Sequence, residues 1–267
     1  MNINVNYLGR LGNNMFQYAF TALVLAEICK KERRDLYTVK SIPITDQLDN
    51  IVDKNVQLVD RAIIDPCSEH VTYARYPATY NITDYGSMEG KILSIDDISS
   101  RPFGFGTTYN FNGFFQHKNY YEGKREFLKS LFSLPKVKDV EFDTAVHIRL
   151  TDYKEINWTL PEKYYDDAIR QATPTNLSVF TDEPSHPYIQ KLRASGAKII
   201  CGEPVNDLGL MSSHKKIIIS RSSYSWWGAI LSDAKIFYPK PSKGFWSEEI
   251  AYKDVAIQDS NFTFIDC

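Results

Sequence analysis

Cysteine is scarce in this chain, with four residues among 267. Cys29, Cys67, Cys201 and Cys267 are scattered, with no C-x-x-C pair and no histidine at zinc-ligand spacing. So few cysteines in a chain of this length do not make a disulfide framework, and they suit a reducing compartment. We therefore expect a cytoplasmic protein, either free or at the inner face of the membrane.

Long hydrophobic runs are also missing. The longest apolar-leaning stretch, residues 16–29, is interrupted by Gln17, Thr21 and Glu27 and is too short to span a bilayer. The first six residues alternate with asparagine and lack the basic and apolar regions of a signal peptide. We expect no transmembrane segment.

An excess of charge of one sign is absent as well. The chain has 31 basic and 33 acidic residues, which gives a formal net charge of −2. This balance builds no broad positive field, so nucleic acid is not an expected partner. A small basic pocket for a phosphate-bearing ligand is compatible with it. Hydrophobic residues make up 43% of the chain, which is typical of a globular protein with a sizeable core.

Several catalytic motifs are missing. The chain has no G-x-x-x-x-G-K-[ST], which excludes a P-loop nucleotidase, and no G-x-G-x-x-G, which argues against a dinucleotide oxidoreductase. G-x-S-x-G and H-E-x-x-H are absent too. The chain also lacks D-x-D, the usual metal clamp of one class of sugar-nucleotide transferases.

What is present is an alternation of strands and helices. A strand over residues 3–7 leads through a glycine-containing loop, residues 9–14, into a helix over 15–31. Signals are weak from 36 to 110, with short strand-like pieces at 57–59 and 91–95. A helix is predicted over 120–134, ended by Pro135.

The pattern becomes regular after Pro135. Five short apolar strands are predicted, over 144–149, 177–180, 198–201, 216–220 and 235–238. The helices between them are predicted over 162–172, 187–194, 207–214, capped by Asn206 or Asp207, and 224–232. Parallel βαβ units of this kind predict an α/β protein with a Rossmann-like domain in its C-terminal half. Two α/β halves, with a boundary near residues 135–142, indicate a cleft between them.

Polar residues follow several of these strands, where open α/β sheets bind ligands. The strand at 144–149 presents His147 and Arg149 on one side and is followed by Asp152. Arg149 either binds a phosphate through two N–H groups or forms an ion pair with Asp152 at a solvated strand end. Asp182 and Glu183 follow the next strand, which by itself is a weak signal.

A serine-rich segment, residues 220–228, ends another strand and begins a helix. Serine hydroxyls and free N–H groups at a helix N-terminus form an anion site, and they serve equally as a helix cap. Trp226 and Trp227 within the segment are expected in the core.

Four segments resemble the α-1,2-fucosyltransferase family, in the same order. Residues 9–19, G-R-L-G-N-N-M-F-Q-Y-A, are similar to its G-G-L-G-N-Q-M-F-Q-Y-A, and residues 113–121, G-F-F-Q-H-K-N-Y-Y, to its G-Y-F-Q-S-E-K-Y-F. Residues 147–153, H-I-R-L-T-D-Y, resemble H-I-R-R-G-D-Y, and residues 222–229, S-S-Y-S-W-W-G-A, resemble S-S-F-S-W-W-G-A.

This resemblance implies a GT-B fold, with two Rossmann-like domains, 1–140 and 141–267, that face a cleft. It also implies an inverting transfer of L-fucose from GDP-β-L-fucose to a sugar hydroxyl, usually O2 of a galactose. It implies no cofactor and no metal. The acceptor would be an oligosaccharide or a glycolipid or lipopolysaccharide. The donor belongs to the C-terminal half and the acceptor mainly to the N-terminal half.

The resemblance also assigns roles to residues. Arg149 would bind the β-phosphate, and His147 and Asp207 the guanine. The other donor-site residues would be Ser222, Ser223, Ser225, Asp182 and Asn13. The acceptor would meet Gln116 and His117, with Phe115 and Tyr120 either stacking on a sugar or buried in the core. Asp152 is either the base that takes the acceptor's proton or the partner that holds Arg149.

The chain departs from the family pattern at several positions. Arg10 replaces glycine, Asn14 replaces glutamine, and Leu150-Thr151 replace Arg-Gly, so a second arginine is missing after Arg149. Two alternatives stay open: an inverting transferase for another sugar nucleotide or acceptor hydroxyl, and a glycan-binding module with a decayed donor site.

Overall fold

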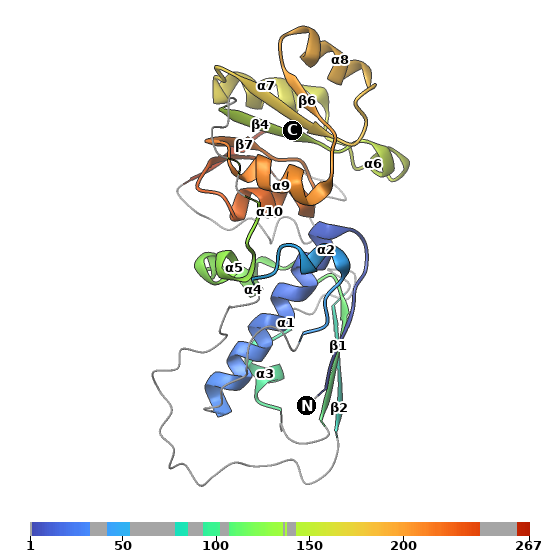
Figure 1. Ribbon diagram of the computed structural model, residues 1–267, viewed down its shortest axis with the longest axis vertical. Helices are drawn as coiled ribbons and strands as arrows, with labels where there is room; N and C mark the ends of the chain where they lie inside the picture. Colours follow the sequence, from blue (N-terminus) through green and yellow to red (C-terminus); the bar gives the residue numbers. More distant parts are fainter. Residues whose placement is uncertain are drawn as a thin grey trace.

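A computed structural model of the chain describes residues 2–32, 42–53, 78–84, 93–101, 107–135, 137, 143–240 and 261–267. The described residues form an α/β structure with two sheets, one of three strands and one of six (Figure 1). The strands of the small sheet lie before residue 114 and those of the large sheet after residue 143. All pairs between named strands are parallel. The α/β class predicted from the sequence is confirmed.

The small sheet has the order β1-β3-β2, with β1 (Asn2–Asn6), β2 (Thr79–Asp84) and β3 (Thr108–Gly113). Its strands alternate because only one face is buried, with Ile3, Tyr109 and Phe111 pointing into the core. The other face carries asparagine and threonine, and Asn110 is hydrogen-bonded to an asparagine on each neighbouring strand. This explains why asparagine alternates with apolar residues at the start of the chain.

Helices cover the buried face of the small sheet. The long α1 (Leu11–Glu32) crosses it and packs against α3 (Ile95–Ser99), and α2 (Asp46–Asp49) lies beside α1 (Figure 1). The strand-like piece expected at 91–95 is wrong at its described end, because Ser94 caps α3 and Ile95 begins it. The piece expected at 57–59 lies outside the described residues.

The helix predicted over 120–134 is two helices, α4 (Lys118–Tyr121) and α5 (Arg125–Leu131). Gly123 between them has a φ of +70°, a left-handed conformation that interrupts a helix and favours glycine. The second helix ends before Pro135, because Phe132 has extended backbone and pairs with Val52.

The large sheet has the order β6-β5-β4-β7-β8-β9. It contains the five predicted strands, β4 (Thr144–Ile148), β5 (Leu177–Thr181), β6 (Lys198–Ile200), β7 (Lys216–Ile218) and β8 (Lys235–Pro239). A sixth strand, β9 (Phe262–Ile265), was not predicted and pairs with β8. Because β4 lies between β5 and β7, the strand order reverses there, and ligands of open α/β sheets bind at such a point.

The helices of the large sheet are α6 (Thr151–Glu155), α7 (Glu162–Ala172), α8 (Pro187–Ala194), α9 (Pro204–Ser212) and α10 (Ser223–Ile230). Helices α7 and α8 have the predicted bounds. Helix α9 begins earlier than expected, with Glu203 as its N-cap residue and Pro204 in its first turn. Neither Asn206 nor Asp207 is therefore the cap, since proline fits the first helical turn and carries the start upstream.

The two sheets meet through α1 and α10. Phe16 of α1 contacts both tryptophans of α10, with ring centroids 4.7 Å from Trp226 and 4.9 Å from Trp227. Gly12 lies against α10 so closely that an added Cβ would come within 2.5 Å of the Tyr224 nitrogen. One continuous cluster of buried apolar residues runs across this contact from the small sheet to one face of the large sheet, and a second cluster packs on the other face of the large sheet. Both tryptophans are in the core as expected.

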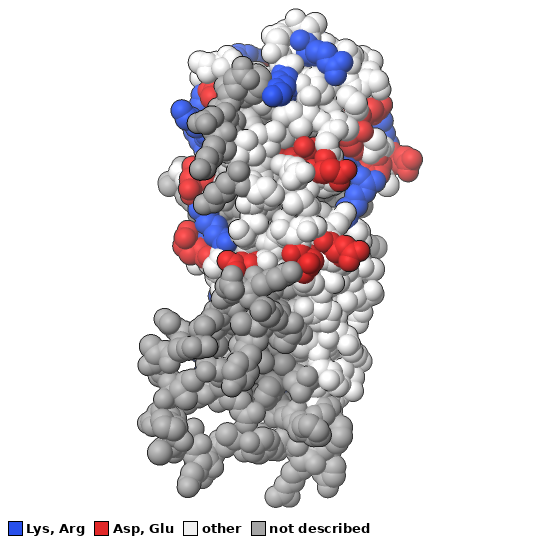
Figure 2. All heavy atoms as spheres, viewed as in Figure 1, with Lys and Arg blue, Asp and Glu red and all other residues white. Residues whose placement is uncertain are grey.

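Charge is spread without a broad field of one sign on the face shown in Figure 2, where basic and acidic side chains of the described residues lie interspersed. Among the described residues, no helix combines the length and apolar character needed to cross a membrane. Among the described cysteines, Cys201 and Cys267 are free thiols.

Candidate functional site

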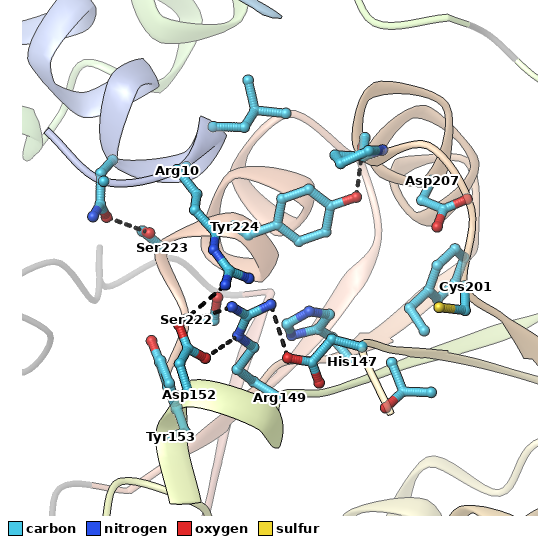
Figure 3. Close-up of a pocket in the computed structure, with 18 of the residues that line it drawn as sticks. Arg10, His147, Arg149, Asp152, Tyr153, Cys201, Asp207, Ser222, Ser223 and Tyr224 are labelled. Carbon is cyan, nitrogen blue, oxygen red and sulfur yellow. Dashed lines mark hydrogen bonds and ion pairs between the residues drawn. The ribbon is translucent and has the colours of Figure 1, made fainter. Parts of the chain in front are cut away.

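A cavity of about 620 Å³ lies where the β1–α1 loop faces the carboxyl ends of β4 and β5 and the start of α10 (Figure 3). Its walls therefore come from both parts of the chain. It is lined by Gly9, Arg10, Leu11, Gly12, Asn13, Gln47, His147, Arg149, Asp152, Tyr153, Phe180, Thr181, Asp182, Cys201, Gly202, Pro204, Asp207, Ser222, Ser223 and Tyr224.

Arg149 is held by two carboxylates. Its Nε and Nη2 atoms each donate a 2.9 Å hydrogen bond to Asp152, and Nη1 lies 2.9 Å from an oxygen of Asp182. Burial acts to lower the pKa of Arg149, but the two carboxylates outweigh it, so the pKa lies above its ordinary value. A guanidinium has five N–H donors, and these contacts do not use all of them. The ion pair and the phosphate site that the sequence offered as alternatives are therefore compatible.

Asp152 is engaged on both oxygens. Burial acts to raise its pKa, but the hydrogen bonds and charge of Arg149, together with the charge of Arg10, bring the pKa below its ordinary value. The Arg10 guanidinium, from the opposite wall, lies 3.8 Å from Asp152. A carboxylate with a lowered pKa is a weak base, so this arrangement favours Asp152 as the partner that positions Arg149.

Asp182 fastens the loop after β4. Its carboxylate accepts hydrogen bonds from the backbone nitrogens of Leu150 and Thr151 as well as from the Thr151 hydroxyl. The side chain thus links the ends of β4 and β5 and stands beside Arg149. The sequence assigned it to the donor site, and it does line the cavity.

His147 lines the cavity from a nearly buried position. Its Nδ1 atom is 2.7 Å from the Ser220 hydroxyl, and its ring lies 5.4 Å from that of Tyr224. Burial, helped by the charge of Arg149, lowers the pKa of His147 to about 3. The imidazole is therefore neutral at physiological pH and acts through hydrogen bonding rather than charge.

The three predicted serines take different places. Ser222 and Ser223 line the cavity at the start of α10, where backbone N–H groups also point outward. Ser225 is fully buried and donates to the Ser222 carbonyl, so it supports the turn from behind and does not line the cavity.

Asn13 ties the two walls together. Its side-chain oxygen accepts a 2.7 Å hydrogen bond from the Ser223 hydroxyl and a 2.9 Å bond from the Gln116 amide. Gln116 and His117, expected on the acceptor side, are both buried and do not line this cavity. Gln116 acts on the cavity through Asn13. The His117 ring instead packs edge-on against Tyr120, 5.6 Å away.

The aromatic residues beside this segment belong to the core. Phe115 and Tyr120 are buried, and Phe115 stacks on Phe20 with ring centroids 4.4 Å apart. The sequence left open whether these two rings stack on a sugar or are buried in the core, and in the structure both are buried.

Asp207 lies at the other end of the cavity. Its carboxylate accepts a 2.7 Å hydrogen bond from the Gly202 nitrogen, and burial is the main cause that raises its pKa above the ordinary value. Figure 3 shows Asp207 and Cys201 on one side of Tyr224, with Arg10, Arg149 and Ser222 on the other. The cavity therefore has a carboxylate end and an arginine end.

Sequence reasoning gave no site role to several residues of the cavity wall, Tyr224 and Arg10 among them. Tyr224 stands in the serine-rich motif but was not given a role, and Arg10 was noted only as a departure from the family pattern. Gln17 of the first motif has a structural role, since its amide donates to the Gly113 carbonyl and its side-chain oxygen accepts from the Leu8 nitrogen. Over the described residues, no group of three or more histidine, cysteine or acidic side chains is arranged to hold a metal ion.

Comparison with known proteins finds a similarity over most of the chain. No protein-family model matches the chain. The chain is 27% identical over 269 aligned positions to an alpha-1,2-colitosyltransferase of Escherichia coli, an alignment that covers 84% of this chain and 86% of that protein. The similarity therefore extends over both sheets, and by its name the relative is a glycosyltransferase.

Proposed function

We propose that the protein is an inverting glycosyltransferase that moves L-fucose from GDP-β-L-fucose to a hydroxyl of an acceptor sugar, O2 of a terminal galactose, and forms an α-1,2 linkage. One observation carries this proposal. Three of the four motif segments, far apart in the sequence, line one cavity, and the fourth reaches it through Gln116 and Asn13. The similarity to a colitosyltransferase over most of the chain supports sugar transfer.

The two ends of the cavity suit the two ends of a sugar nucleotide. Asp207 offers a carboxylate oxygen to the N–H groups on the edge of guanine, and His147 and Tyr224 lie between it and the arginine end. The phosphates would meet the remaining N–H donors of Arg149 and the hydroxyls of Ser222 and Ser223. Backbone N–H groups at the start of α10 add to this anion site.

The proposed step breaks one bond and forms one. The acceptor hydroxyl oxygen attacks C1 of the sugar as the bond from C1 to the phosphate oxygen breaks, and GDP leaves with the electron pair. Arg149 and the start of α10 stabilise the negative charge that develops on the phosphate, which makes metal unnecessary. One preorganised hydrogen-bond donor of this kind lowers the activation free energy by about 3–4 kcal/mol. The hydroxyl proton leaves to solvent or to a basic side chain. Asp152 is a poor candidate for this base, because Arg149 donates hydrogen bonds to both of its oxygens.

The relative's name favours a second candidate donor, a colitose nucleotide. Colitose is L-fucose without the hydroxyl at carbon 3, so the same cavity could serve either sugar. A site that hydrogen-bonds this hydroxyl discriminates strongly against the sugar that lacks it. The acceptor, an oligosaccharide or a glycolipid or lipopolysaccharide, is proposed on the family resemblance.

Binding and transfer separate the candidates. We would titrate the protein with GDP, GDP-fucose, GDP-colitose and UDP-galactose, and assay transfer to lactose, lacto-N-biose and N-acetyllactosamine in excess EDTA. The proposal expects tight binding of GDP and GDP-fucose, and an α-1,2-linked product. Preference for GDP-colitose favours the second candidate. Preference for UDP-galactose would overturn both candidate donors, as would a protein that binds glycans but none of the nucleotides.

A further inference from the structure

The charges that line the cavity pose a problem for an anionic ligand. Arg149 is already balanced by Asp152 and Asp182, both at 2.9 Å, and Asp207 adds a third carboxylate. A sugar nucleotide carries negative charge on both phosphates. Arg149 can donate hydrogen bonds to them, but its positive charge is largely compensated. The cavity needs a cation that is not already committed.

Arg10 is such a cation. Its side chain is 69% exposed, and its guanidinium lies 3.8 Å from an oxygen of Asp152 that also accepts a hydrogen bond from Arg149. An exposed ion pair of this kind contributes about 0–1 kcal/mol. The guanidinium can therefore turn from Asp152 to a phosphate at little cost.

The backbone that carries Arg10 is fixed in place. Gly9 has a φ of +75°, and the Gly12 carbonyl accepts a 3.0 Å hydrogen bond from the indole of Trp227. The loop between β1 and α1 is thus fastened to α10, and the Arg10 side chain extends from it toward Arg149 and Asp152 (Figure 3). Arg10 lines the cavity together with Ser222 and Ser223.

The sequence departs from the fucosyltransferase pattern at two positions that fit this picture. The pattern has glycine at position 10 and arginine at position 150, whereas this chain has Arg10 and Leu150. Leu150 is buried in the core of the large sheet and brings no charge to the cavity. The cation lost at position 150 is present at position 10, on the other wall.

We propose that Arg10 supplies the positive charge that binds the diphosphate of the sugar nucleotide, from the wall opposite Arg149. The proposal rests on the proposed function, since it takes a nucleoside diphosphate as the ligand. Arg149 stays paired with Asp152 and Asp182 and contributes hydrogen-bond donors. The diphosphate is then bound between an arginine of the β1–α1 loop and the start of α10, so donor binding draws on both parts of the chain.

The test compares ligands with and without phosphate. Affinity for GDP would be measured by calorimetry and affinity for guanosine by NMR titration, on the wild type, Arg10→Gln, Arg10→Lys and a control, Arg193→Gln. Arg193 lies on α8, is exposed, and does not line the cavity. We expect Arg10→Gln to raise the Kd for GDP at least tenfold and to make this Kd less dependent on salt concentration. The Kd for guanosine should stay within twofold of the wild-type value. Arg10→Lys should lose less, and the control should match the wild type.

Two results would overturn the proposal: an Arg10→Gln protein that binds GDP within twofold of the wild type, or one that loses GDP and guanosine equally. The second would mean that the loop had shifted and no phosphate contact had been removed. A wild type that binds GDP no better than guanosine would contradict the proposed function itself, which keeps the two failures distinguishable.

Discussion

At the residue scale, Arg149 has two tasks that only a planar guanidinium combines. It holds Asp152 through two parallel hydrogen bonds and pairs with Asp182, while keeping N–H donors for a ligand. We expect Arg149→Lys to reduce kcat/KM for transfer below a tenth of the wild-type value. Lysine keeps the charge but lacks the planar pair of N–H donors that binds a carboxylate or phosphate through two hydrogen bonds. Arg149→Ala should abolish transfer. The measurement is steady-state kinetics with GDP-fucose, with Arg193→Lys as control.

Retention of more than about a tenth of the activity by Arg149→Lys would contradict this role, since that loss corresponds to only ~1.4 kcal/mol in the barrier. Unchanged melting temperatures in the variants would show that the loss concerns the cavity and not the fold.

His147 should make the protein sensitive to mild acid. Its pKa falls from about 6.5 in an unfolded chain to about 3 in the fold, chiefly through burial. The contribution to stability is therefore complete above pH 6.5 and is lost as the pH falls toward 3, because only the unfolded state then takes up the proton. At pH 5.5 the free energy of unfolding should be about 1.4 kcal/mol lower than at pH 7.5 on this account.

His147→Gln isolates this contribution. His214 is also buried with a lowered pKa, so the wild type alone would report both histidines. Denaturant unfolding at the two pH values should show a smaller loss in the variant, by about 1.4 kcal/mol. An equal loss in both proteins would mean that His147 takes up its proton as readily in the fold as in the unfolded chain.

The positions of single residues at strand ends could be predicted from the sequence, but the contacts around those residues could not. The alternation of the strand at 144–149 brings His147 and Arg149 to one side, and the structure has both on the cavity wall. Whether Arg149 would bind a ligand or Asp152 could not be read from spacing, because one guanidinium can do both. Gln116 shows the limit more clearly: its motif indicated the cavity, but its position behind Asn13 depends on packing between segments about a hundred residues apart.

At the element scale, the contact between α1 and α10 depends on a glycine. A Cβ at Gly12 would approach the backbone of Ser223 and Tyr224 within 2.5–2.7 Å, where no side chain can give way. We expect Gly12→Ala to lower the free energy of unfolding by about 2 kcal/mol or more, as in other overpacked contacts. It should also weaken GDP binding, because the displaced loop carries Arg10 and Asn13.

Gly228→Ala is the control, since Gly228 lies on the same helix α10 but in its contact with α9. A Cβ there meets the sulfur of Met211 at 2.9 Å, the mobile part of a flexible side chain, so the cost should stay below about 1 kcal/mol. Thermal unfolding and calorimetry of both variants would decide the point. Equal destabilisation by the two substitutions would show that backbone contact at Gly12 is not what limits its size.

Elements with a strong period or clear end signals were predicted best. Helices α7 and α8, with Pro161 before one and Pro187 at the start of the other, have the predicted bounds. The interruption at Gly123 was missed because a left-handed glycine leaves the apolar period on either side intact. Strands β2 and β3 were missed because each is half polar, and the pairing of β3 with β1 and β2 arises only in the folded chain.

At the scale of the whole molecule, the small sheet and one face of the large sheet share a core. The sequence predicted two halves with a boundary near residues 135–142, and the sheets do use separate parts of the chain. It gave no sign of how the halves would join, since the aromatic residues of α1 and α10 are far apart in sequence. Their contact also positions the cavity walls, so the fold and the proposed donor site depend on the same junction.

This shared core predicts that the protein unfolds in one step. Phe16 packs between Tyr121 and the two tryptophans of α10, so neither sheet can lose its structure without exposing the core that the two sheets share. Calorimetry should give a single transition with equal calorimetric and van't Hoff enthalpies. Phe16→Ala should lower its midpoint, at a cost of about 3–5 kcal/mol, without splitting it. Phe264→Ala, at the exposed edge strand β9, should cost much less. Two separate transitions in the wild type would mean that the halves are independent domains and that the contact between α1 and α10 contributes little to stability.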